Sequence, residues 1–166
     1  GHCMLQKKRG TLKITVRKLF QARPVWPVIV VEDCSGRVLA LAEINEAGFR
    51  KTLRTGQSHY WDSVNQVVYL KGEHSNEIET VRDIRLDICS ARRHKPSLLF
   101  RVDLAPGKCL YGMDTCFFYH FEDKYFQVDQ KSVIDREACS EHCSRIQMLF
   151  SDAEDVEHQR RFMKKK

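Results

Sequence analysis

Two cysteines frame the loop in the segment GKCLYGMDTCFFYH, and their spacing suits a pair of metal ligands. Cys109 and Cys116 lie seven residues apart. Thiolates bind zinc well, but a catalytic zinc site takes three protein ligands, so a third must come from elsewhere in the chain. Cys89 is the first candidate, and His94 and His120 are others. The alternative is that these cysteines fill the core as small apolar residues, which is common for cysteine.

A second cluster, YLKGEHSNE, follows an expected strand and joins a cation to several polar side chains. Lys71 could meet a phosphate, and the glycine after it leaves backbone N–H groups accessible. Glu73, His74 and Ser75 follow directly. An ordinary polar hairpin turn would explain the same residues without any ligand.

Two further clusters could bind a ligand. In SARRHKPS, Arg92 and its basic neighbours form a patch that suits a phosphate, or else a solvated loop. Near the C-terminus, Cys139, His142 and Cys143 have the spacing that places side chains on one face of a helix. That face could bind a metal, or it could pack its thiols against the domain.

The elements that must position these residues are mostly strands, identified by alternation and β-branched content. Strands are expected over residues 10–19, 27–33, 37–44, 58–63, 66–72, 78–89, 98–104 and 115–121. A helix is expected over residues 45–56, with Asn45 as its N-cap and Gly56 at its end. After Asp129 apolar residues recur at helical spacing, which predicts one or two helices and a basic tail.

The sequence therefore predicts an α+β fold, a strand-rich domain with a C-terminal helical extension. We divide the chain into an N-terminal strand extension (1–23), a central strand-rich domain (24–121) and a helical extension with a basic tail (122–166).

Composition narrows the class of protein. The 166 residues fit one domain plus an extension, and their net charge of +6 comes largely from the last seven residues. Nucleic acid is therefore not an expected partner. No apolar stretch approaches the roughly 20 residues that span a bilayer, and no secretory segment opens the chain, so we expect a cytoplasmic protein without a membrane partner. In that compartment the seven cysteines favour thiols or metal ligands over disulfides.

Three segments, in order, carry a resemblance to a known family. They are PVIVVEDCSGRVLALAEINEAGFRKTLRTGQSHYWDS, VVYLKGEHS and SLLFRVDLAPGKCLYGMDTCFF. In the third, Cys109, Gly112, Cys116 and Phe117 fall in register with a Cys-His-x-Gly-x-x-x-Cys-Phe motif. Over about residues 24–118 the chain resembles the phosphoribosyl-AMP cyclohydrolases of histidine biosynthesis, so the central domain (24–121) is expected to be a phosphoribosyl-AMP cyclohydrolase-like domain.

This resemblance implies a zinc hydrolase that opens the six-membered adenine ring of phosphoribosyl-AMP by adding water next to N1. It also implies a homodimer, with zinc held by three cysteines from both chains and magnesium held by a cluster of aspartates. Cys109 and Cys116 carry over as ligands. Cys89 and Asp87 lie in the stretch that matches the third cysteine and the aspartates of the family.

The chain departs from the family in that stretch. The family's Asp-Cys-Asp-x-Asp motif is replaced by residues 87–91, DICSA, so the cysteine is displaced by one position and two aspartates are missing. A shift of one residue turns a strand side chain to the other face unless a bulge corrects it. Asp83 and Asp87 alone supply few of the oxygens that magnesium requires, so magnesium is a doubtful cofactor, and zinc is the expected one.

The family's histidine after the first loop cysteine is also replaced, by Leu110. His74, next to Glu73, is the expected acid–base replacement, and His94 is another. The residues expected to hold the substrate and its phosphate are Lys71, Ser75 and Arg92.

We therefore expect a zinc-dependent hydrolase that acts on a phosphorylated purine-type nucleotide as a homodimer with a shared metal site. The alternatives are a hydrolase of a different phosphorylated heterocycle, and a non-catalytic nucleotide- or metal-binding module. A third is a protein-interaction module that works through the C-terminal helices.

Overall fold

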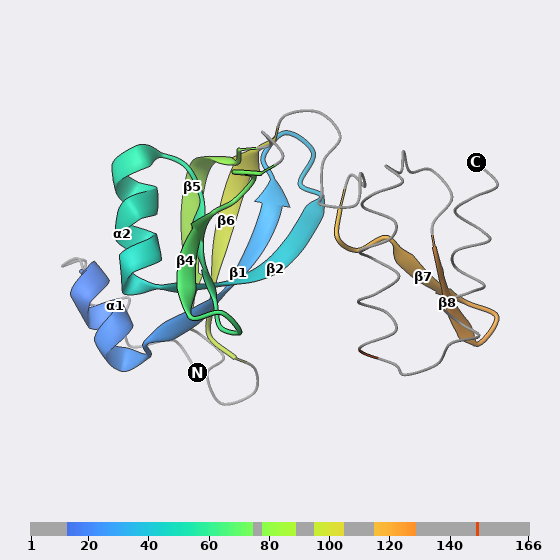
Figure 1. Ribbon diagram of the computed structural model, residues 1–166, viewed down its shortest axis with the longest axis horizontal. Helices are drawn as coiled ribbons and strands as arrows, with labels where there is room; N and C mark the ends of the chain where they lie inside the picture. The colour runs from blue at the N-terminus through green and yellow to red at the C-terminus, as the bar shows by residue number, and fades with distance from the viewer. Residues whose placement is uncertain (1–12, 75–77, 89–94, 105–114, 129–148, 150–166) are drawn as a thin grey trace, which may run out of the picture.

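The computed structural model describes residues 13–74, 78–88, 95–104, 115–128 and 149 (Figure 1). The described elements in chain order are α1 (Val16–Ala22), β1 (Val25–Glu32), β2 (Val38–Asn45), α2 (Glu46–Thr55), β3 (His59–Asp62), β4 (Val67–Leu70), β5 (Thr80–Asp87), β6 (Ser97–Asp103), β7 (Tyr119–Glu122) and β8 (Tyr125–Val128). Strand outweighs helix among them, and the predicted strand-rich α+β domain is confirmed.

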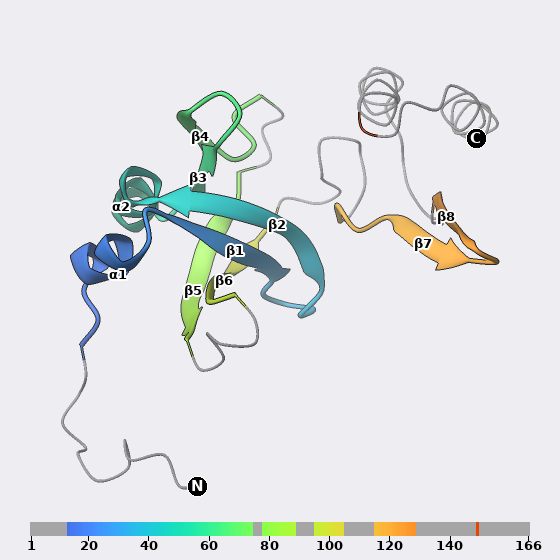
Figure 2. The same cartoon turned by 90° about the horizontal axis from the view of Figure 1, so that it is seen from below.

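The central element is a four-stranded sheet in the order β2-β1-β6-β5. β1 and β6 run parallel, and the other two neighbouring pairs run antiparallel. β2 and β5 are therefore the two edges of this sheet, as Figure 1 shows. The β7–β8 hairpin lies beyond the β2 edge in both views (Figure 2).

The core lies between the sheet on one side and the two helices with the β3–β4 hairpin on the other. Phe100 of β6 is fully buried at its centre, and its ring stands 6.3 Å from the ring of Phe49 on α2. Asn45 caps α2, because its Oδ1 accepts a hydrogen bond from the Gly48 amide at 2.9 Å. Gly56 ends the helix with a φ of +73°, a conformation that glycine adopts without strain. Both predicted ends of this helix are thus confirmed.

The β3–β4 hairpin is joined to the sheet by the three residues that precede it. Residues 56–58 pair antiparallel with residues 79–81, through a bridge between Gln57 and Thr80. The Ser58 amide donates to the Glu79 carbonyl at 3.1 Å, and the Val81 amide donates to the Gly56 carbonyl at 2.8 Å. The hairpin therefore continues the edge of β5 at the strand's N-terminal end, next to α2 (Figure 2).

A β-bulge alters the side-chain alternation predicted for the long strand. The register of β5 against β6 shifts between Val81 and Asp83. Val81 and Ile84 consequently both pack against the core, although strict alternation would place them on opposite faces.

The strand expected over residues 10–19 is wrong for its described part, because Val16–Ala22 form helix α1. Thr15 begins the helix by accepting a hydrogen bond from the Lys18 amide at 3.2 Å. Leu19 and Phe20 are buried, and the Trp26 indole donates to the Leu19 carbonyl at 3.0 Å. Tertiary packing thus overrides the alternating pattern.

The remaining predictions for these elements have different outcomes. The hairpins over residues 27–44 and 58–72 are confirmed, as are strands β5 and β6. The strand predicted over residues 115–121 begins only at Tyr119, and it pairs with β8, which was not predicted. The basic loop and, apart from Leu149, the helices predicted after Asp129 lie outside the described residues. The first residues of the predicted helical extension, 122–128, form the end of β7 and β8 instead. The proposed domain boundaries stay predictions.

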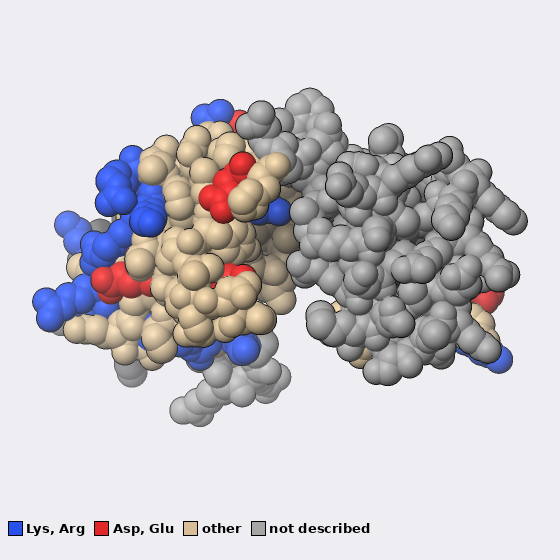
Figure 3. Space-filling view, in the orientation of Figure 1, with Lys and Arg blue, Asp and Glu red and all other residues tan. Residues whose placement is uncertain are grey.

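Basic side chains gather over α1 and α2 on the described surface (Figure 3). The exposed members are Arg17, Lys18, Arg50, Lys51 and Arg54. Glu46 and Arg50 form an ion pair at 3.1 Å one helical turn apart. None of the helices in the described ranges is long and apolar enough to cross a membrane.

Candidate functional site

Cys116 lies along the outer edge of β2. Its amide donates to the Leu39 carbonyl at 2.8 Å, and the neighbouring Thr115 hydroxyl donates to the Val38 carbonyl at 2.8 Å. The segment therefore lines the free edge of the sheet, and Cys116 is exposed there. An exposed thiol in a fixed backbone position is accessible to a metal ion.

Asp87, predicted to share a metal with Cys116, lies at the last position of the opposite edge strand. It is paired with Ser97 of β6 and is half-buried. When the residue pairing is followed from β2 through β1 and β6 to β5, Leu39 lies at about the height of Asp83, which is four residues before Asp87. Leu39, whose carbonyl holds the Cys116 amide, is therefore about 14 Å from Asp87 across the sheet and about 13 Å from it along the strands. One chain therefore cannot bring Asp87 and Cys116 to the same metal ion.

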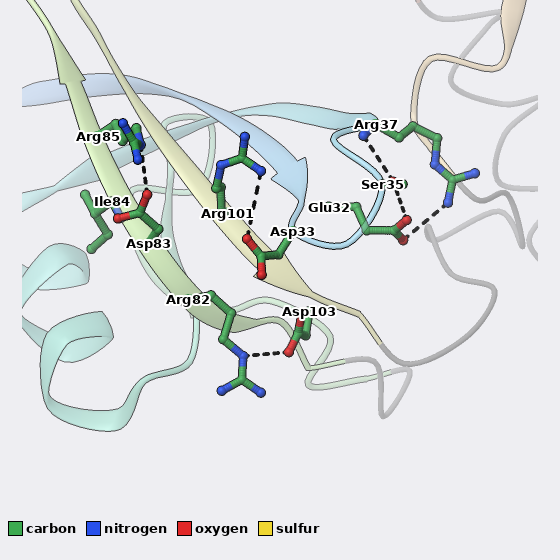
Figure 4. A network of polar contacts seen from close by, with 10 residues as sticks. All are labelled: Glu32, Asp33, Ser35, Arg37, Arg82, Asp83, Ile84, Arg85, Arg101 and Asp103. Carbon is green, nitrogen blue, oxygen red and sulfur yellow. Dashed lines mark hydrogen bonds and ion pairs between the residues drawn. The ribbon is translucent and has the colours of Figure 1, made fainter.

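Several other acidic side chains of the sheet and its turns are paired with arginines (Figure 4). The Asp83 carboxylate accepts from the Arg85 guanidinium at 2.8 Å, and Arg82 pairs with Asp103. Within the described ranges, no three His, Cys, Asp or Glu side chains come together as a set that could hold a metal ion. Cys89 and Cys109, the other predicted ligands, lie outside these ranges.

Lys71, Glu73 and His74 lie together at the end of β4. The Lys71 amide donates to the Ser58 carbonyl at 3.0 Å, which extends the β3–β4 pairing by one residue. His74 Nε2 lies 3.2 Å from Glu73 Oε1, and its side chain is 93% exposed. The predicted histidine–carboxylate pair therefore forms on the surface. Ser75 and Arg92 lie outside the described residues.

The sequence did not predict the buried polar group beside Lys71. Glu79 is 2% exposed, and its Oε2 accepts a hydrogen bond from the Tyr60 hydroxyl at 2.6 Å. Burial raises the pKa of the Glu79 carboxyl, against the opposing effects of Tyr60, Ser58 and the Lys71 charge. Burial and then the neighbouring Glu79 carboxylate raise the pKa of Tyr60 well above its usual value. Tyr60 therefore stays protonated and donates to Glu79.

Tyr69 packs beside this buried group. Its ring stands 6.1 Å from the Tyr60 ring, across the β3–β4 pair. Burial raises the pKa of Tyr69, and the charges of Glu79, Asp62 and Cys116 raise it further. Cys116 is thus within electrostatic reach of the same tyrosine as Glu79.

A shallow hollow of about 350 Å³ lies elsewhere, between the end of α1 and the start of α2. Phe20, Asn45 and Trp61 are among the residues that line it. None of the predicted site residues contributes to it, so its shape carries no argument about the cysteine site.

Comparison with known proteins gives a consistent result. The family described as Phosphoribosyl-AMP cyclohydrolase matches residues 40–118, which include both Lys71 and Cys116. The chain is 36% identical over 110 residues to "Phosphoribosyl-AMP cyclohydrolase" of Desulfotalea psychrophila, covering 66% of this chain and 83% of that protein. It is 33% identical over 112 residues to the protein of that name from Hydrogenovibrio crunogenus, covering 68% and 73%. It is also 33% identical over 125 residues to "Histidine biosynthesis bifunctional protein HisIE" of Lactococcus lactis, covering 73% of this chain and 57% of that protein.

Proposed function

This chain belongs to the phosphoribosyl-AMP cyclohydrolase family, and we propose that it hydrolyses phosphoribosyl-AMP by adding water to the adenine ring next to N1. The observation that carries the proposal is the 36% identity over 110 residues to a relative of that name. The N1-substituted adenine ring is cationic, so the carbon beside N1 is electrophilic and open to attack by water. Histidine biosynthesis is the corresponding proposed role.

We assign substrate binding to the end of the β3–β4 hairpin where β4 finishes. Lys71 is half-buried at the end of β4, and its backbone is fixed by the hydrogen bond to Ser58. A lysine ammonium in such a place suits a phosphate group of the substrate, and holding that group would orient the adenine ring. Tyr69, also half-buried and two residues earlier, offers an aromatic face on the same side of the hairpin.

The donor chemistry fits zinc, provided that two chains contribute. Cys116 presents an exposed thiol at one edge of the sheet, whereas the residues leading to Cys89 lie at the other edge. Cys109 and Cys116 of one chain with Cys89 of a second would supply three thiolates, the number that a catalytic zinc site takes. Bound zinc would lower the pKa of its water to about 7 and so supply hydroxide at neutral pH. A homodimer with shared sites is therefore part of this proposal.

Asp87 is half-buried at the end of β5 that leads to Cys89. We propose that it supports the metal site from that second chain. With Asp83 already held by Arg85, the described aspartates fall short of the oxygens that magnesium takes, so magnesium has no part in the proposal.

His74 with Glu73 is proposed as the acid–base pair that replaces the family histidine. His74→Ala should reduce turnover at least roughly a hundredfold if His74 transfers the proton. Glu122→Ala is the control, because that residue is also exposed and has no part in the proposed site. Full activity of the His74 variant would remove this residue from the mechanism.

The direct test of the function is turnover of phosphoribosyl-AMP, followed by the change in ultraviolet absorbance as the ring opens. Turnover that is lost with a chelator and restored by zinc would support the proposal. Binding of phosphoribosyl-AMP without turnover by the zinc-loaded protein would favour the non-catalytic nucleotide-binding alternative instead.

A further inference from the structure

We propose that Glu79, held by Tyr60, positions the side chain of Lys71 across Ser58 and so fixes the phosphate-binding group of the site. Glu79 would thus be a positioning residue that acts through Lys71. The use of Lys71 for phosphate rests on the proposed function. The pairing of Glu79 with Lys71 does not.

The register places these side chains in one row. Ser58 pairs with Lys71 on one side, where the Lys71 amide donates to its carbonyl at 3.0 Å. On the other side, the Ser58 amide donates to the Glu79 carbonyl at 3.1 Å. Residues directly opposite each other on paired strands project to the same face. Lys71, Ser58 and Glu79 therefore project to one face, with Ser58 in the middle.

The middle position holds a small side chain, which leaves the outer two able to interact across it. Ser58 is fully buried. Within the described part of the chain, its Oγ has no hydrogen-bond partner. Its hydroxyl still lies close enough to favour the charged form of Glu79. A larger apolar residue here would separate Lys71 from Glu79.

A buried carboxylate needs compensation, and this row supplies it. Glu79 is 2% exposed, and the Tyr60 hydroxyl satisfies one of its oxygens. Among the charged groups described, the Lys71 ammonium is the one that favours ionised Glu79. The flexible lysine side chain can extend along this row toward Glu79, and the proposal is that the Glu79 charge holds it there. Loss of this attraction would free Lys71 to sample solvent.

A double-mutant cycle in urea, at pH 8 on the full chain, tests the pairing without any substrate. Lys71→Met should lower the urea midpoint by about 0.5 M in the wild-type background and leave it unchanged in the Glu79→Gln background. Lys51→Met, which removes the same charge from the exposed face of α2, is the matched control and should leave the midpoint unchanged. Equal losses in both backgrounds would overturn the proposal.

A second comparison keeps the test decisive if Glu79→Gln does not fold. Lys71→Arg retains the charge, so its midpoint should match that of the wild type, whereas Lys71→Met should not. Equal midpoints for these two Lys71 variants would show that the charge is not used, and would overturn the pairing.

Turnover then tests the consequence for the substrate. Glu79→Gln should raise the KM for phosphoribosyl-AMP about five- to tenfold with kcat changed less than about twofold, because lysine placement affects binding. The double variant with Lys71→Met should be no worse than Lys71→Met alone. A fall in kcat at constant KM would contradict positioning. Absence of turnover in the wild type would overturn the proposed function while the urea cycle still decides the pairing.

Discussion

The two ends of β5 differ in how their acidic side chains are accommodated. Before its first residue, Glu79 is buried and receives a hydrogen bond from Tyr60 of the same chain. At its last residue, Asp87 is half-buried at the opposite edge of the sheet from Cys116. The residues that accommodate Glu79 all come from one chain. The proposed role of the second end requires another chain, which makes oligomeric state part of the catalytic proposal.

The largest expected effect comes from Cys116. Cys116→Ala should reduce turnover at least about a hundredfold and abolish bound zinc, because it removes a ligand. Zinc content by mass spectrometry and turnover of phosphoribosyl-AMP measure this. Cys34→Ala is the matched control, since that thiol is also exposed and lies in the β1–β2 turn, and it should leave both quantities unchanged. A zinc-replete Cys116→Ala protein would remove Cys116 from the site.

A smaller effect, on stability, is expected at the other end of β5. Tyr60→Phe removes the hydroxyl that donates to buried Glu79, which should lower the unfolding free energy by about 1–3 kcal/mol. Urea unfolding at pH 8 measures it. Tyr125→Phe, at an exposed tyrosine of β8, serves as the control and should change the unfolding free energy by less than about 0.5 kcal/mol. Equal stabilities of the two variants would show that the buried hydrogen bond contributes little.

The smallest effect is a pH dependence carried by Glu79. Its pKa is raised above the ordinary value of 4.5, so the folded protein holds this proton more tightly than the unfolded chain does. Stability of the wild type relative to Glu79→Gln should therefore fall as pH rises from about 4.5 through the raised pKa, and level off above it. Urea unfolding of both proteins between pH 4 and 8 measures this. A constant difference across that range would show that folding leaves the Glu79 pKa unchanged.

Local sequence signals were sufficient for most of the sheet. The turn chemistry between residues 32 and 38 and the cap residues Asn45 and Gly56 are short-range signals, and the structure bears them out. Helix α1 could not be predicted in this way, because Leu19 and Phe20 are buried in the core, where the Phe20 ring stands 5.6 Å from that of Phe49 on α2. β8 was also missed, since its turn at Asp123 and Lys124 adopts positive φ without the usual glycine.

The candidate site was less predictable than the fold. The motifs pointed to Lys71 and Cys116 by sequence alone, but the distance between Cys116 and Asp87 depends on strand order, which no local pattern contains. Glu79 gave no signal, because a glutamate at the start of an alternating segment is usually solvated. Its burial follows from pairing with Ser58 and from Tyr60, nineteen residues earlier in the chain.

The most direct test of a site shared between two chains is subunit complementation. Cys116→Ala and Cys89→Ala are each purified as inactive, zinc-poor protein, then mixed, unfolded and refolded together. Half of the resulting dimers would contain one variant of each kind, and one of their two sites would keep all its cysteines. The account predicts recovery of about a quarter of the wild-type turnover, with zinc in proportion. A mixture as inactive as either variant alone would contradict it.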